Sequence, residues 1–106
     1  MKNISDMSIL ITGGGSGIGE GTASYFVKHG AKVTICGRNK DKLENVSKKL
    51  GNSCHAVKCD ITKNDERINL IEEAINHGLK LNALINNAGN MLRGPLTCLL
   101  YTSPSP

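Results

Sequence analysis

The chain has 106 residues, 39% hydrophobic and 21% charged, a composition typical of a globular protein and not of a disordered or fibrous one. At this length it forms one domain at most, with a modest core, and it lacks the run of about 18 apolar residues that a membrane span needs. Its net charge of +4 is scattered, and two tyrosines, one phenylalanine and no tryptophan argue against a nucleic-acid partner.

The first strong pattern is an apolar run at residues 9–11 followed by a glycine-rich turn. The run has no polar alternation, which is typical of a strand buried on both faces of a parallel sheet. Glycines crowd residues 13–17, and a helical pattern begins near Gly17. Glycine lets backbone amides approach a phosphate, and a helix N-terminus adds unpaired N–H groups and a positive dipole end. The stretch therefore predicts a pyrophosphate cradle; the alternative is a glycine turn without a ligand.

A helix, a strand and a second helix are predicted next. The first helix stops at Gly30, and its apolar face consists of Ala23, Phe26 and Val27. Residues 32–36 are β-branched and apolar, which favours a strand. Asn39 or Asp41 caps the second helix, whose apolar stripe consists of Leu43, Val46 and Leu50. We interpret the lysines of that helix as its solvated face; they are Lys40, Lys42, Lys48 and Lys49.

The remaining pattern repeats this alternation. Residues 54–59 predict a third strand and residues 81–85 a fourth. The helix between them is capped by Thr62, Asn64 or Asp65, and its predicted apolar face consists of Ile68, Ile71, Ala74 and Ile75. Right-handed crossovers then give an α/β fold, a Rossmann-like doubly wound parallel sheet with strands ordered 3-2-1-4 and helices on both faces.

Four motifs, in this order, resemble the N-terminal cofactor-binding part of the short-chain dehydrogenase/reductase family. They are Thr-Gly-Gly-Gly-Ser-Gly-Ile-Gly at residues 12–19, Gly-Arg at 37–38, Asp-Ile at 60–61 and Asn-Asn-Ala-Gly at 86–89. The resemblance spans roughly residues 8–89. It implies a partial NAD(P)-binding Rossmann domain over residues 1–97, without the C-terminal half of the sheet.

The resemblance also implies which residues contact a nicotinamide dinucleotide. The pyrophosphate would be surrounded by Gly13, Ser16, Gly17, Ile18 and Gly19, with Ile18 contributing its backbone N–H. Asp60 and the Ile61 backbone would contact the adenine ring, and the alternative for Asp60 is a cap at the strand end. The adenosine-ribose side would be lined by Asn87, Ala88 and Gly89, with Asn86 bracing the loop.

The end of the second predicted strand favours NADP over NAD. NAD sites commonly hold the ribose 2′-hydroxyl with an acidic residue at this place, where this chain has Gly37 followed by Arg38. A guanidinium offers a fork of donors and a fixed charge to a 2′-phosphate, and glycine removes a repelling carboxylate. The alternative is that Arg38 is a solvated turn residue.

No catalytic residue is assigned. Catalysis in the family uses a Ser and a Tyr-x-x-x-Lys pair, whereas Tyr25 is followed four residues on by His29, and Tyr101 by Ser105. The resemblance thus implies a parent oxidoreductase that acts on a small carbonyl or alcohol, as a homo-oligomer, while this chain alone is expected to be inactive. The alternative is a non-catalytic nucleotide-binding or interaction module.

The cysteines, histidines and termini complete the expectations. The four cysteines lack Cys-x-x-Cys spacing, which predicts reduced thiols in a cytoplasmic protein, without a metal site. His29 and His77 are expected to contact carbonyls at their own helix ends. The polar N-terminus has no signal-peptide core. One reverse translation of residues 98–106 resembles a sequencing-library transposon-end adapter, so we expect a non-native tail; the alternative is a disordered Ser/Pro-rich terminus.

Overall fold

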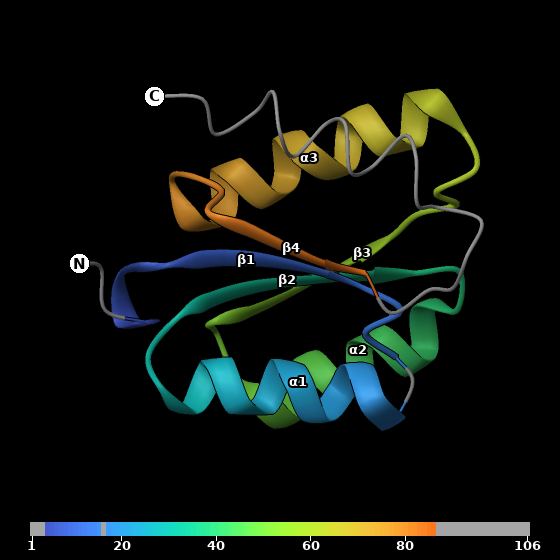
Figure 1. The fold of residues 1–106 in the computed structure, drawn as a ribbon. Coiled ribbons are helices and arrows are strands. Elements are labelled where there is room, and N and C mark those ends of the chain that lie inside the picture. The colour runs from blue at the N-terminus through green and yellow to red at the C-terminus, as the bar shows by residue number, and fades with distance from the viewer. Residues whose placement is uncertain (1–3, 16, 87–106) are drawn as a thin grey trace.

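A computed structural model describes residues 4–15 and 17–86, and the expected tail at 98–106 lies outside them (Figure 1). A 3-10 turn, η1 (Ile4–Asp6), precedes the other elements. These are β1 (Ser8–Thr12), α1 (Gly17–Lys28), β2 (Lys32–Gly37), α2 (Lys40–Leu50), β3 (Cys54–Lys58), α3 (Asn64–Gly78) and β4 (Ala83–Asn86). The four strands are parallel and ordered β3-β2-β1-β4. The predicted Rossmann-like α/β fold and its strand order are confirmed.

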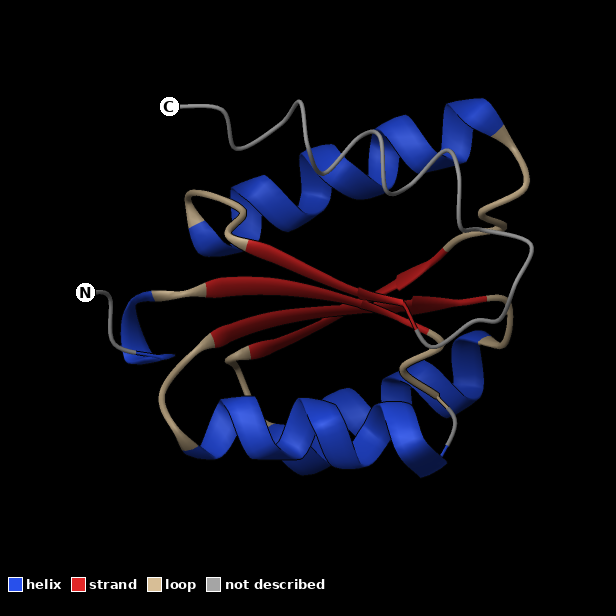
Figure 2. Cartoon of the chain, viewed as in Figure 1, coloured by secondary structure: helices blue, strands red, loops and turns tan. Residues whose placement is uncertain are grey.

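The sheet is covered on both faces. Helices α1 and α2 lie on one face and α3 on the other (Figures 1 and 2). The apolar run of β1 serves both layers because successive side chains of a strand point to opposite faces. Ile9 and Ile11 belong to the core on the side of α1 and α2, whereas Leu10 belongs to the core under α3. A strand without polar alternation is therefore what this position requires.

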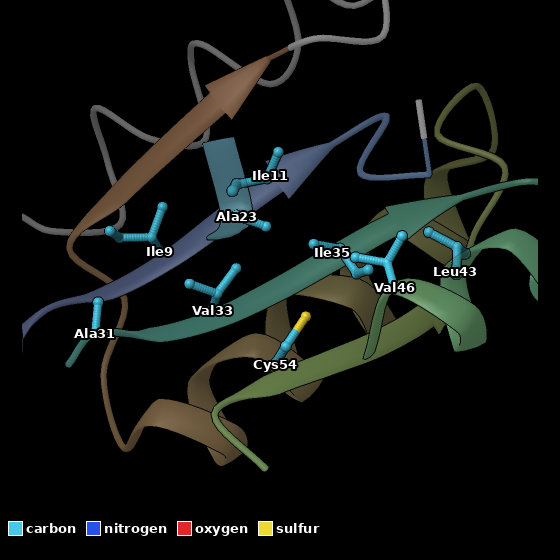
Figure 3. Close-up of a cluster of buried hydrophobic side chains, with 9 residues drawn as sticks. All are labelled: Ile9, Ile11, Ala23, Ala31, Val33, Ile35, Leu43, Val46 and Cys54. Carbon is cyan, nitrogen blue, oxygen red and sulfur yellow. The ribbon is translucent and has the colours of Figure 1, made fainter. Parts of the chain in front are cut away.

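Each core joins strands to the helices above them. The core under α1 and α2, shown in Figure 3, contains Ile9, Ile11, Ala23, Ala31, Val33, Ile35, Leu43, Val46 and Cys54. The core under α3 contains Leu10, Cys36, Val57, Cys59, Leu70, Ala74 and Leu81. These packed layers hold the carboxyl ends of the strands, where the turns emerge, in fixed relative positions.

Helix ends agree with the sequence in two places. Asn39 is the N-cap of α2, and its side-chain Oδ1 accepts a hydrogen bond from the Lys42 amide at 3.1 Å. Gly30 follows α1 with φ of +90°, a conformation that favours glycine. Both predictions are confirmed.

Three predictions about α3 and β4 differ in part from the structure. Lys63 is the N-cap of α3 and makes no side-chain cap hydrogen bond, so none of the three proposed caps acts there. The predicted apolar face of α3 is right for Ala74, which is fully buried, and for Ile71, which packs against the core under α3. It is wrong for Ile68 and Ile75, which are 53% and 39% exposed, and it omitted the fully buried Leu70. Finally, β4 spans Ala83–Asn86 where residues 81–85 were predicted, although the backbone N–H of Asn82 already donates to the Ser8 carbonyl.

Candidate functional site

The predicted site lies where the parallel strands end. The glycine turn follows β1, Gly37 ends β2 and Arg38 follows it, Asp60 follows β3, and Asn86 ends β4. Parallel strands bring their carboxyl ends to one edge of the sheet, seen at the right in Figure 1. The helix that leaves β1, α1, and the helix that leads into β4, α3, lie on opposite faces of the sheet, so the strand order reverses between β1 and β4. Ligands of doubly wound sheets bind at such a reversal point. The topology therefore gathers the described residues of the four motifs at this end of the sheet.

The start of the glycine turn is anchored to β2. The Gly13 and Gly14 amides both donate to the Cys36 carbonyl, at 2.9 and 3.2 Å. Gly13 has φ of +71°, in the left-handed region that favours glycine. Gly13 thus shapes the turn, and its amide is engaged within the protein.

The glycines of the turn differ in what surrounds them. A Cβ on Gly14 would lie 2.4 Å from the Ile35 Cβ, and a Cβ on Gly19 would lie 2.2 Å from the Gly13 carbonyl oxygen. Packing therefore requires both of these glycines. A Cβ on Gly17 would meet no atom within 4 Å among the described residues. Packing in the described part of the chain gives no reason for a glycine at the first residue of α1.

The residues next to Gly17 have two different outcomes. Ile18 is 76% exposed, which is unusual for a large apolar side chain beside a turn. Ser16, predicted at the pyrophosphate, lies outside the described residues. The exposed surface at the N-terminus of α1 thus consists of a glycine and an uncovered isoleucine.

A hollow of about 190 Å³ lies beyond the end of β2. It is lined by Gly13, Gly15, Gly37, Arg38, Asn39, Lys42 and Leu43. Among the described residues, the lining contains two cationic side chains and no carboxylate, so it suits an anion. Arg38 lies where the sequence predicted it. The sequence pattern indicated a solvated helix face for Lys42 and did not reveal its position at the hollow. The sequence signal that could have revealed it is that Lys42 lies in the first turn of the helix that begins just after β2.

The Asp60 segment after β3 is held by a local network. The carboxylate Oδ1 of Asp60 accepts hydrogen bonds from the Thr62 hydroxyl at 2.6 Å and the Thr62 amide at 3.0 Å. The Asp60 amide donates to Glu66 Oε1 at 2.7 Å, and Arg67 Nη1 donates to the Ile61 carbonyl at 2.8 Å. Asp60 therefore has the capping role that the sequence left open. Glu66 and Arg67, which position the segment, carried no recognised sequence signal.

These contacts also set the charge of the segment. Hydrogen bonds from the Thr62 side chain and backbone, with a smaller contribution from the Arg38 and Lys63 charges, hold the pKa of the Asp60 carboxyl below its usual value. Since an ionised carboxylate only accepts hydrogen bonds, Asp60 offers acceptor oxygens to a ligand at neutral pH.

Replacing Thr62 with valine is expected to raise the Asp60 pKa, because the hydroxyl bond is the largest cause of the depression. The stabilisation from ionised Asp60 is present at neutral pH and is lost as the pH falls through its folded pKa, so the loss moves to higher pH in Thr62→Val. A carbon-detected NMR titration of the carboxyl measures this. Thr22→Val, which removes a hydroxyl bonded to the Ile18 carbonyl, is the control. An unchanged Asp60 titration in Thr62→Val would contradict the expectation.

The end of β4 is tied to β1. The Thr12 hydroxyl donates to Asn86 Oδ1 at 2.9 Å, so Asn86 joins the ends of the two strands; the loop that it was expected to brace lies outside the described residues. The next three predicted residues, Asn87, Ala88 and Gly89, lie outside the described part of the chain.

The described cysteines are buried thiols. Cys36, Cys54 and Cys59 form no disulfide. Burial raises the pKa of Cys36 to about 12 and of Cys54 and Cys59 to about 11, so all three are protonated at neutral pH. Within residues 4–15 and 17–86, no three His, Cys, Asp or Glu side chains are placed to hold a metal ion.

The histidines make structural contacts. His29 Nδ1 contacts the Tyr25 carbonyl at the end of α1, as predicted. His77 instead contacts the Ser53 carbonyl before β3, so the expectation for His77 is wrong. His55 pairs with Glu73 at 2.9 Å.

No helix in the described segments is long and apolar enough to cross a membrane.

Comparison with known proteins gives a consistent result. The family model for short chain dehydrogenases matches residues 7–100. An uncharacterized oxidoreductase of Staphylococcus aureus (strain MRSA252) is 43% identical over 98 residues, covering 92% of this chain and 42% of the relative. One of Staphylococcus saprophyticus is 42% identical over 92 residues, covering 86% and 37%. The chain thus spans about two fifths of the length of these relatives.

Solved structures extend the comparison to the fold. A 3-ketoacyl-(acyl-carrier-protein) reductase from Brucella melitensis, complexed with NADH, superposes with a TM-score of 0.74 at 40% identity, over 76% of this chain and 34% of that one. A short chain dehydrogenase from Bacillus anthracis superposes with a TM-score of 0.78 at 34% identity, over 84% and 37%.

Proposed function

Because the chain belongs to the short-chain dehydrogenase/reductase family, we propose that it forms the cofactor-binding part of an NADP-dependent oxidoreductase. The whole protein would interconvert a small carbonyl compound and its alcohol. The observation that carries the proposal is the contrast among the turn glycines. Packing explains Gly14 and Gly19, whereas Gly17 faces open space at the first residue of α1, as close approach of a phosphate to backbone amides requires.

The proposed contacts follow the order of the site. The first-turn amides of α1, at Gly17 and Ile18, bind the pyrophosphate with Ser16, while Gly13 and Gly19 fix the shape of the turn. The Asp60 carboxylate and the Ile61 backbone bind the adenine ring, and Asn87, Ala88 and Gly89 line the ribose. The bound cofactor supplies the hydride acceptor or donor. This chain contributes the position of the cofactor and the charged groups that surround it.

The hollow beyond β2 supports NADP over NAD. Gly37 leaves no carboxylate to repel a 2′-phosphate, and Arg38 contributes a guanidinium to the lining. The Brucella melitensis relative is complexed with NADH, so the preference proposed here rests on Arg38 and not on that likeness.

We expect no turnover from the 106 residues alone. Neither tyrosine is followed by lysine four residues on, so the chain lacks the tyrosine–lysine pair that lowers the pKa of a proton-donating hydroxyl. For the whole protein we propose a cytoplasmic homo-oligomer. The second candidate is a nucleotide-binding module without catalysis. NADPH binding together with oxidation of NADPH by a carbonyl substrate would exclude the second candidate.

Binding of NADPH and NADH, measured by calorimetry, tests the cofactor assignment. Charged hydrogen bonds contribute about 1.5–3 kcal/mol, so Arg38→Ala is expected to weaken NADPH binding by roughly 10- to 100-fold and NADH binding by less than about 2-fold. Lys40→Ala is the control, since Lys40 pairs with Glu44 and does not line the hollow. An unchanged ratio of the two affinities in Arg38→Ala would overturn the NADP assignment.

A further inference from the structure

We propose that Lys42 is a second determinant of cofactor specificity, which binds the 2′-phosphate of NADP together with Arg38. The inference rests on the proposed function and adds to it a residue on a different element. Arg38 follows β2, whereas Lys42 is the third residue of α2.

The backbone of Lys42 is held in place at the rim of the hollow. Its amide donates to the Asn39 side chain at 3.1 Å, and the next amide, from Leu43, donates to the Asn39 carbonyl at 3.2 Å. The Leu43 side chain is 1% exposed and anchors the helix in the core. A Cβ on Gly15 would lie 3.3 Å from the Lys42 Cβ, so this part of α2 sits directly against the glycine turn. The flexible side chain therefore starts from a fixed point.

The charge of the hollow matches a phosphate monoester better with Lys42 than without it. Such a group carries about −1.5 to −2 charges at pH 7, and one guanidinium balances about half of this. Lys42 and Arg38 together bring two positive charges. The Asp60 carboxylate interacts with the Arg38 charge but is not among the residues that line the hollow. Arginine suits bidentate contact with two phosphate oxygens, and lysine acts as a mobile point charge. The two residues thus have complementary roles.

Other carboxylates do not occupy this lysine. Lys40 pairs with Glu44 at 3.9 Å and Lys49 with Glu20 at 3.1 Å. In residues 4–15 and 17–86, no acidic side chain lies within ion-pair distance of Lys42. Within the described residues, its ammonium group is therefore available to a ligand.

The test compares two probes that differ only in the 2′-phosphate: adenosine 2′,5′-bisphosphate and 5′-AMP. For Lys42→Met we expect affinity for the bisphosphate to fall by roughly 3- to 10-fold and affinity for 5′-AMP to change by less than about 2-fold. Lys42→Arg is expected to restore binding, and the loss should shrink at high salt. Lys48→Met is the control, because this substitution removes the same charge from the same helix and Lys48 does not line this hollow.

The outcomes separate the two proposals. Equal loss in Lys42→Met and Lys48→Met would indicate a general charge effect and overturn the role of Lys42. A selective loss in Arg38→Ala but none in Lys42→Met would overturn the role of Lys42 and leave the proposed NADP specificity standing. If the chain without substitutions bound both probes equally, or neither, the proposed NADP site would be overturned and the Lys42 inference with it.

Discussion

Replacing Gly17 with valine is expected to lower the affinity for NADPH by more than about 100-fold while changing the free energy of unfolding by less than about 1 kcal/mol. A Cβ at Gly17 meets no atom of the described residues, so the folded chain has room for the new side chain. That room is where a pyrophosphate would approach the first amides of α1, and a branched side chain fills it. Calorimetry gives the affinity, and urea unfolding followed by circular dichroism gives the stability.

Gly21→Val is the matched control for this result. Gly21 lies in the same helix and also faces open space, so the substitution changes helix propensity by a similar amount. It is one turn further from the glycine turn and is expected to leave NADPH binding intact. Unchanged NADPH affinity in Gly17→Val, in a folded chain, would contradict binding of the pyrophosphate at the start of α1.

Gly19→Ala is expected to have the opposite effect, a large loss of stability. The added methyl would lie 2.2 Å from the Gly13 carbonyl oxygen and 2.8 Å from the Gly14 Cα, and both are backbone atoms that no rotamer change can move. Overpacking of this kind costs about 1–3 kcal/mol or more. A domain that is stable by only about 5–15 kcal/mol loses a large share of its stability.

Gly21→Ala provides the comparison for that loss. With open space around it, alanine is expected to stabilise α1 by up to about 1 kcal/mol through helix propensity. Urea unfolding of both variants measures the difference. If Gly19→Ala unfolded at the same urea concentration as the chain without substitutions, α1 would not be packed closely against the glycine turn. NADPH binding is expected to weaken in parallel with stability, because the turn must shift.

The arrangement of strands was predictable because it depends on local patterns and on handedness. The unbroken apolar run of β1 and the alternation of strands with helices lead to the order 3-2-1-4 once right-handed crossovers are applied. The facing side of α3 was not predictable in the same way. The predicted face held Ala74 and Ile71, which pack on the core, but also the exposed Ile68 and Ile75, while Leu70 was missed. Both sets fit helical spacing, so the rotation of α3 about its axis is fixed by packing across the fold and not by the local pattern.

The candidate site was predictable only where it follows the chain locally. Arg38 comes directly after β2, so its place at the strand end could be read from the sequence. Lys42 lines the same hollow because of the rotation of α2 about its axis, which the Asn39 cap and buried Leu43 fix in three dimensions. The different demands on Gly14, Gly17 and Gly19 also depend on contacts across the fold, since the three residues have the same side chain.

The order of the strands has a consequence for how a dinucleotide leaves. The glycine turn and Arg38 follow β1 and β2, which are paired on both sides, whereas Asp60 follows β3, which in the described sheet pairs only with β2. Local opening requires least free energy at edges and most in the paired interior. Hydrogen exchange should therefore be faster around Asp60 than around the glycine turn. The adenine end of a bound dinucleotide would be the first to detach, with the phosphates still held.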